Sequence, residues 1–226
     1  MNLAARIGTM AKRGAPLPYD AEVEYLESTG TQYIDINVEC SIDSAFEIIC
    51  APTVTTEQFI GLIGSTANNR FHISLFSNGY TRGCISVIQK PIVSSDTDFH
   101  RITLDARNKS ASVDETNVSI NYTQGDFPSG LGFWIFGRYS PNSSYQRKGF
   151  FKIKSFMFYD EGISIRGFIP VRFTNENGER EGAMYDRAGS GGMNPDGTPR
   201  TDGLYRNRGT GSFGWQDKNG VYVPPT

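Results

Sequence analysis

A succession of short apolar runs, each closed by a turn signal, constrains this chain more than any other feature of its sequence. The runs are rich in β-branched and aromatic residues, and several alternate apolar with polar positions, as strands with one buried face do. Apart from a weak case near the N-terminus, no window of about 11 residues keeps the 3.6-residue apolar period of a helix. Strands are therefore expected at 46–49, 71–76, 85–88, 100–105, 112–114, 133–136 and 150–159.

Turn signals separate these runs. Asn78-Gly79 suits a type I′ hairpin because both residue types tolerate a positive φ. Similar signals stand at 108–109, 160–162 and 177–178, and the 25 glycines and 11 prolines fit such frequent chain reversals. Many antiparallel strands without crossover helices predict an all-β fold, an antiparallel β-sandwich or a barrel.

Composition and charge exclude several classes of protein. The 38 % of hydrophobic residues is enough to build a sizeable core, so global disorder is excluded. A net charge of −2 argues against a general nucleic-acid binder. The chain also lacks the run of about 20 apolar residues that a membrane span needs. We therefore expect neither nucleic acid nor membrane as a partner.

Three cysteines and two histidines are the only soft metal ligands in the sequence, and they are scattered: Cys40, Cys50, His72, Cys84 and His100. A structural zinc site needs four such ligands at tight spacing, so no metal site of this kind is expected. An odd number of cysteines also makes a full disulfide framework improbable. The cysteines are expected to be small buried apolar residues.

Residues 1–18 differ in composition from the rest of the chain. Arg6, Lys12 and Arg13 are their only charged side chains, and the first acid is Asp20. Arg6 interrupts the only apolar stretch, so no convincing secretory signal is present. Two interpretations stay open for this segment: a loose leader, or a basic anchoring arm with a proline linker that orders on an acidic partner surface.

Residues 19–226 are expected to form a single domain. Within it, 188–203 is so rich in Gly, Pro, Asn and Asp that it is predicted as a long loop, either an interaction surface or an insertion. Asp196 and Asp202 are the candidates there for a calcium site, although they lack a regular ligand spacing. No other cofactor is expected.

Several longer phrases carry a resemblance to a known family. The opening phrase is Glu-Tyr-Leu-Glu-Ser-Thr-Gly-Thr-Gln-Tyr-Ile-Asp at 24–35, and matching phrases follow in order at 154–160, 166–172, 182–186 and 204–213. Together they resemble the concanavalin A-like, laminin G-type jelly-roll domains of bacteriophage virion proteins and gut-bacterial surface proteins. The sequence departs from that pattern at Gly167, where relatives often have an acid, and in its longer 188–203 loop.

The resemblance implies a concanavalin A-like jelly roll with an extended N-terminal arm. It also implies a bacteriophage virion structural protein, of the capsid decoration or fibre type, located in the virion and assembled in the host cytoplasm. Its partners would be other virion proteins, capsid or tail, held through the arm, and host polysaccharide bound weakly for adhesion. The alternative is a carbohydrate-binding module of a bacterial surface or secreted protein.

We expect no enzymatic activity. Retaining glycoside hydrolysis, known on this architecture, needs two carboxylates about 5–5.5 Å apart, and the Glu-x-Asp-x-x-Glu strand of sandwich glucanases is absent. Glu22 and Glu24 are interpreted as a solvated face of the entry strand. No nucleophile elbow surrounds a serine, neither histidine lies in a motif, and no phosphate-binding loop is present.

The best candidate for binding is an aromatic strand that runs into a polar loop. Aromatic faces suit the CH groups of sugars, while Asn and Arg suit the hydroxyls, so this cluster predicts glycan binding. The alternative is that Trp134 and Phe136 are core residues and the rest is a solvated turn. The candidate glycan-binding residues are Trp134, Arg138, Tyr139, Asn142 and Tyr145, with Arg147 beside them.

Overall fold

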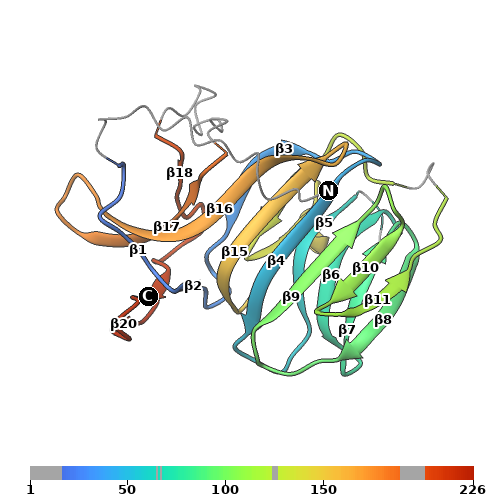
Figure 1. Ribbon diagram of the computed structural model, residues 1–226, viewed down its shortest axis with the longest axis horizontal. Helices are drawn as coiled ribbons and strands as arrows, with labels where there is room; N and C mark the ends of the chain where they lie inside the picture. The colour runs from blue at the N-terminus through green and yellow to red at the C-terminus, as the bar shows by residue number, and fades with distance from the viewer. Residues whose placement is uncertain (1–16, 65, 67, 124–126, 189–201) are drawn as a thin grey trace.

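Two sheets of hydrogen-bonded strands form the described part of the chain, which is residues 17–64, 66, 68–123, 127–188 and 202–226 of the computed structural model (Figure 1). In these residues every strand pair is antiparallel except β13 with β5. The all-β prediction is confirmed, since the only helix described is the 3₁₀ turn Ser143–Tyr145. None of the described residues form a helix with the length and apolar content of a membrane span.

Sheet A has twelve described strands. Its main path runs β11-β10-β9-β4-β15-β16-β17-β18, β2 pairs with β15 and β19, β1 pairs with β16, and β20 pairs with β19. The strands are β1 (Ala21–Glu22), β2 (Tyr25–Glu27), β4 (Ala45–Pro52), β9 (His100–Asp105), β10 (Ser110–Val113), β11 (Thr116–Ser119), β15 (Phe151–Asp160), β16 (Ile163–Thr174), β17 (Arg180–Asp186), β18 (Leu204–Tyr205), β19 (Gly214–Gln216) and β20 (Tyr222–Val223).

Sheet B has eight described strands. Its main path runs β14-β13-β5-β6-β7-β8, while β12 pairs with β3 and β5. The strands are β3 (Ile34–Glu39), β5 (Gln58–Ile63), β6 (Arg70–Ser77), β7 (Tyr80–Ile85), β8 (Ile88–Ser94), β12 (Gly132–Ile135), β13 (Gly137–Tyr139) and β14 (Arg147–Lys148).

The predicted turns are where the sequence places them. Asn78 and Gly79 have φ values of 53° and 80°, and they connect β6 to β7 as a type I′ turn requires. Glu161 and Gly162, at 50° and 79°, connect β15 to β16 in the same way. These reversals are local, so short polar segments with glycine predict them without knowledge of the rest of the fold.

One strand prediction is wrong. Residues 85–88 are not a strand: Ile85 pairs with Ile88 across a tight turn, and Ser86 has a φ of 55°. The alternation Ile-Ser-Val-Ile resembles a strand because the apolar ends of two strands flank a turn that contains no Gly or Asn. The predicted strand 133–136 is confirmed as β12 (Gly132–Ile135), which ends one residue earlier because Phe136 has a φ of 63° and separates β12 from β13.

The main core lies between the two sheets and is strongly aromatic. Rings from sheet A meet rings from sheet B: Phe46 on β4 lies 5.5 Å from Phe71 on β6, and Phe156 on β15 lies 5.6 Å from Phe133 on β12, between ring centroids. All four side chains are at most 1 % exposed. Packing of apolar faces from both sheets therefore holds the layers together.

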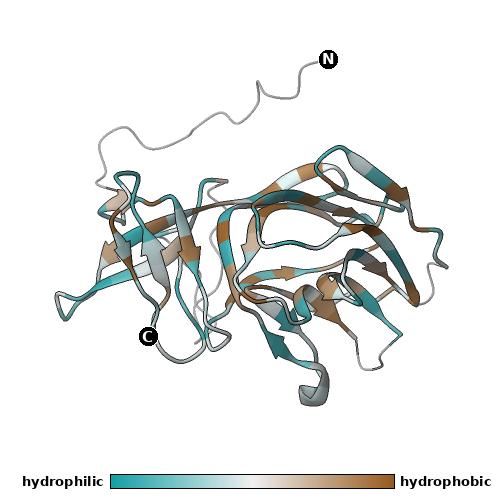
Figure 2. Cartoon of the chain, turned by 90° about the horizontal axis from the view of Figure 1, so that it is seen from below, coloured by the Kyte–Doolittle hydropathy of each residue, from teal (hydrophilic) through white to brown (hydrophobic). Residues whose placement is uncertain are grey.

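A smaller core lies at one end of the molecule, where β1, β17, β18 and β20 gather at the left of Figure 1. It is formed by Val171, Phe173, Ala183 and Leu204. The view from below in Figure 2 shows the same two parts, with apolar residues along the strands of each.

Pro170 lies on β16, the long strand that contributes to both the main core and the smaller core. β15 pairs with β16 as far as Phe168, and β1 begins to pair at Val171, so Pro170 lies in the interval between the two partners. Its missing N–H therefore breaks no ladder bond on that side, and its carbonyl accepts a 3.0 Å hydrogen bond from the Val23 amide. Pro170 is not at a sheet edge, because it pairs with Met184 of β17 on the other side of β16.

The three cysteines are free and buried, as the sequence predicts. Burial raises the pKa of the Cys50 thiol to about 12 and that of Cys84 to about 11. Both thiols therefore stay protonated near neutral pH and pack as small apolar groups.

Candidate functional site

The outward face of sheet B carries polar side chains in a regular pattern. Along β6, Phe71, Ile73 and Leu75 belong to the main core. Because successive residues of a strand project to opposite faces, Arg70, His72 and Ser74 lie on the other side of the sheet. The sequence of β6 thus divides into an apolar inner row and a polar outer row.

One row of residues, one from each neighbouring strand, crosses this outer face from one side of the sheet to the other. Cross-strand partners share a face, so the pairing register identifies the members of the row. In order from β14 to β8 they are Arg147, Arg138, Gly61, His72, Cys84 and Gln89.

Gly61, at the centre of this row, is required by the backbone. Its φ is +129°, and a Cβ placed there would lie 2.4 Å from the Phe71 carbonyl oxygen and 2.8 Å from the His72 Cα. A groove of about 200 Å³ opens on this face. Its lining residues are Glu57, Phe59, Ile63, Arg70, His72, Ser74, Gln89 and Arg138.

Arg138 is fixed within the groove. Only 8 % of the residue is exposed, and its Cζ lies 3.9 Å from the centroid of the Phe59 ring, which is a cation–π contact. Burial lowers the pKa of Arg138 to about 10, and the charge of Arg147 adds to the shift, yet the guanidinium stays charged at neutral pH. The groove therefore holds a rigid cation.

His72 lies in the same groove as an uncharged group. Burial lowers its pKa well below the ordinary value, and the charges of Arg138 and Arg70 lower it further. Its Nδ1 faces the Leu62 carbonyl at 3.4 Å. The imidazole thus contributes hydrogen-bonding capacity without positive charge near neutral pH.

Three aromatic rings pack together beside the groove. The Trp134 ring stacks on Tyr33, with centroids 3.9 Å apart and planes at 29°, and meets the edge of Tyr139 at 5.4 Å. Trp134 pairs with Gly61, so it is on the outer face rather than in either core. It is 6 % exposed, and its buried Nε1 has no hydrogen-bond partner among the described residues.

The structure brings together three of the predicted glycan-binding residues: Trp134, Arg138 and Tyr139. Asn142 is exposed and instead caps the 3₁₀ turn, where its side chain accepts a hydrogen bond from the Ser144 amide. Tyr145 ends that turn, and its side chain lies outside the described residues. The interpretation of Phe136 as a core residue is confirmed, whereas Trp134 is buried under tyrosines on the outer face.

Sequence reasoning missed Tyr33, Phe59 and Arg70. For Arg70 a signal was present, because polar residues alternate with apolar ones along 70–75. Tyr33 carried no such signal. It reaches Trp134 only because β3 pairs with β12, with Asp35 opposite Trp134.

The other predicted sites lie mostly outside the described residues. This holds for Arg6, Lys12 and Arg13 and for Asp196 in the long loop. The Asp202 carboxylate accepts a hydrogen bond from the Leu204 amide and lies 3.7 Å from Arg206. In the described part of the chain no three His, Cys, Asp or Glu side chains are grouped as metal ligands. The calcium site therefore stays a prediction.

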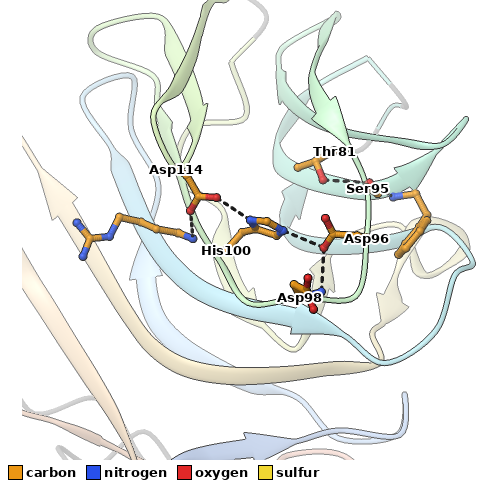
Figure 3. A network of polar contacts seen from close by, with 8 residues as sticks. Thr81, Ser95, Asp96, Asp98, His100 and Asp114 are labelled. Atoms are coloured by element: carbon orange, nitrogen blue, oxygen red, sulfur yellow. Dashed lines mark hydrogen bonds and ion pairs between the residues drawn. The ribbon is translucent and has the colours of Figure 1, made fainter.

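A second polar cluster surrounds His100, where the chain crosses from sheet B to sheet A (Figure 3). The His100 Nδ1 lies 2.6 Å from Asp114, and its Nε2 lies 2.8 Å from Asp96. Asp114 also accepts a hydrogen bond from the Arg101 amide. Since both ring nitrogens face carboxylates, neither is placed to deprotonate a hydroxyl nucleophile.

This cluster predicts a pH-dependent contribution to stability. Burial lowers the pKa of His100, but hydrogen bonds to Asp114 and Asp96 outweigh it, so the net pKa is raised. Its stabilisation is therefore complete below the ordinary pKa of 6.5 and is lost as the pH rises through the raised value. The two aspartates have lowered pKa values, so their contribution is lost only in acid.

We expect the wild-type protein to exceed His100→Gln in free energy of unfolding at pH 6, and this difference to shrink by pH 8.5. The groups are largely exposed, so the effect should be below about 1 kcal/mol. Urea denaturation of both proteins at several pH values measures it. A difference that does not vary with pH would contradict the assignment.

Chemically, the face of sheet B offers apolar ring surface, fixed cations and amide or imidazole hydrogen-bonding groups, which together suit recognition of a polar ligand. No protein-family model matches the sequence, and neither does any curated protein.

Proposed function

We propose that this chain is a bacteriophage virion structural protein, of the capsid decoration or fibre type, that displays a glycan-binding face. Its fold would be a concanavalin A-like, laminin G-type jelly-roll sandwich. The resemblance of the phrases at 24–35 and 154–213 supports this proposal, and so do two antiparallel sheets packed over an aromatic core.

The observation that carries the glycan part is the contact of the Trp134 ring with the rings of Tyr33 and Tyr139, close to Arg138, which lies opposite Gly61 as Trp134 does. Sugars present apolar CH faces and polar hydroxyl rims. Aromatic rings match the CH faces, while guanidinium and amide groups match the hydroxyls. Because the rings already pack on one another, little side-chain entropy is lost on binding.

Attachment to the virion is assigned to residues 1–18, with Arg6, Lys12 and Arg13 contacting an acidic surface of a capsid or tail protein. This part of the proposal rests on the family resemblance and on the basic composition of the segment. A carbohydrate-binding module of a bacterial surface or secreted protein would use the same glycan-binding face without this attachment.

One experiment tests both parts by comparing three proteins: the full chain, a chain lacking residues 1–18, and Tyr139→Ala. Each is measured for binding to purified phage capsids or tails and to host polysaccharides. We expect the truncated chain to lose binding to particles and to keep binding to polysaccharide. Tyr139→Ala should bind particles normally and polysaccharide at least about tenfold more weakly, as expected for an aromatic binding residue.

Tyr222→Ala is the matched control, because Tyr222 is a tyrosine 45 % exposed on β20 of sheet A. It should bind both targets as the full chain does. Equal particle binding by the full and truncated chains would contradict the anchoring role. Polysaccharide binding without any particle binding would favour the bacterial alternative.

A further inference from the structure

Positive charge is concentrated on the face of sheet B that carries the groove. Arg82 pairs with Ser74, and Arg147 pairs with Arg138, so both share the outer face with Arg70. Glu57 is the only acidic residue in the groove lining. The whole chain has a net charge of −2, so this positive face is a local feature and not a consequence of overall composition.

Arg70 is the cation best placed to meet a ligand. Among the described residues no carboxylate oxygen lies within ion-pair distance of its guanidinium, and it is only partly buried. Its side chain is oriented by the Val87 carbonyl at 3.4 Å from Nη1 and by the Gln89 amide, whose oxygen accepts from Nη2 at 3.2 Å when turned toward it.

The dimensions of the groove limit the ligand. About 200 Å³ is less than the roughly 300–1,000 Å³ of typical small-molecule pockets, so it suits one sugar residue and not an oligosaccharide. Trp134 and Arg138 both lie opposite Gly61, so the aromatic group adjoins the groove. A glycan chain that places one residue in the groove can therefore rest its neighbour on the rings.

We propose that this groove binds the acidic residue of an anionic glycan, with Arg70 and Arg138 contacting its carboxylate or sulfate. A planar guanidinium donates two parallel hydrogen bonds to such an anion, which gives both affinity and orientation. The inference rests on the proposed function and names the glycan class. Arg70 is then a specificity-determining residue, because it contacts the anion. The rings contact the apolar face of a sugar whether or not the sugar is charged.

The test uses pairs of polysaccharides that differ only in charge. Polygalacturonate is compared with its methyl ester for the carboxylate, and dextran sulfate with dextran for the sulfate. We expect the full chain to bind at least one acidic member at least about tenfold more tightly than its neutral partner. This preference should weaken between 50 and 300 mM salt, since surface charges are screened.

Two variants locate the effect. Arg70→Gln should bind the acidic glycan about tenfold more weakly and the neutral one unchanged. Arg107→Gln is the control: it removes the same charge from an exposed site beside Asp43, after β9 in sheet A, and should bind as the full chain does. A thermal melt of each variant verifies that it is folded.

The outcomes separate this inference from the proposed function. Equal binding of neutral and acidic glycans overturns the anionic specificity and leaves glycan binding standing. Binding of none of the polysaccharides overturns both. Equal losses in Arg70→Gln and Arg107→Gln would mean that attraction to the whole surface, and not this groove, selects the anion.

Discussion

Phe133→Ala is expected to lower the free energy of unfolding by about 3–5 kcal/mol, the usual cost of removing a buried phenylalanine side chain from a tight core. Phe133 is fully buried on β12 of sheet B. Its ring contacts four others, three of them on sheet A: Phe46, Phe156 and Phe158 on sheet A, and Phe71 on sheet B. The resulting cavity would therefore lie between the two sheets, where collapse requires movement of whole strands.

Chemical denaturation measures this loss, with Phe150→Ala as the matched control. Phe150 is 37 % exposed, so its truncation should cost less than about 1.5 kcal/mol. A cost for Phe133→Ala no greater than that of the control would contradict the assignment of Phe133 to the contact between the sheets.

Arg166→Leu is the second change with a large expected effect. Asp186 is 1 % exposed, and its Oδ1 accepts 2.9 Å hydrogen bonds from the amides of Gly167 and Ala188. Its Oδ2 forms an ion pair with Arg166, 3.8 Å from the Nε, and that Nε donates its hydrogen bond to the Ile36 carbonyl. Removal of the arginine would leave a buried carboxylate without its cation, at a cost of about 3–5 kcal/mol at pH 7.

The pH dependence of this variant provides a second measurement. Burial already raises the pKa of Asp186, against the hydrogen bonds and Arg166, and loss of the cation should raise it further. A folded-state pKa above the unfolded one stabilises at low pH and loses that contribution as the pH rises. Arg166→Leu should therefore be least stable relative to wild type at neutral pH and should recover partly toward pH 4.

Arg107→Leu is the control here. Arg107 lies 4.0 Å from Asp43 at an exposed site, so its loss should cost less than about 1 kcal/mol at any pH. A cost of this size for Arg166→Leu at pH 7 would show that the Arg166–Asp186 pair is not a significant constraint on β16 and β17.

The sequence predicts turns well where the residue type itself favours the backbone φ that the turn needs. Asn78, Gly79 and Gly162 adopt the positive φ values that their residue types favour. The prediction failed at 85–88, where Ser86 adopts a positive φ that its residue type does not favour. There the pairing of β7 with β8 determines the turn, and local propensity does not.

The candidate site was predicted only in part, because sequence patterns reveal residues that are close together in the chain. Trp134, Arg138 and Tyr139 are close in sequence, so a single segment reveals them. Phe59 and Arg70 come from β5 and β6, and Tyr33 comes from the segment before β3. Only the register between strands brings these residues to the same face.

The sequence by itself determines that the chain is all-β and where many of its reversals lie, through its short apolar runs and the turn signals between them. They act through the nearest neighbours of each residue, so no long-range information is needed. The tertiary structure decides which strands are adjacent, because two sheets must bury their aromatic faces against each other. That pairing places the Arg70 and Arg138 side chains in one groove and covers Trp134 with Tyr33.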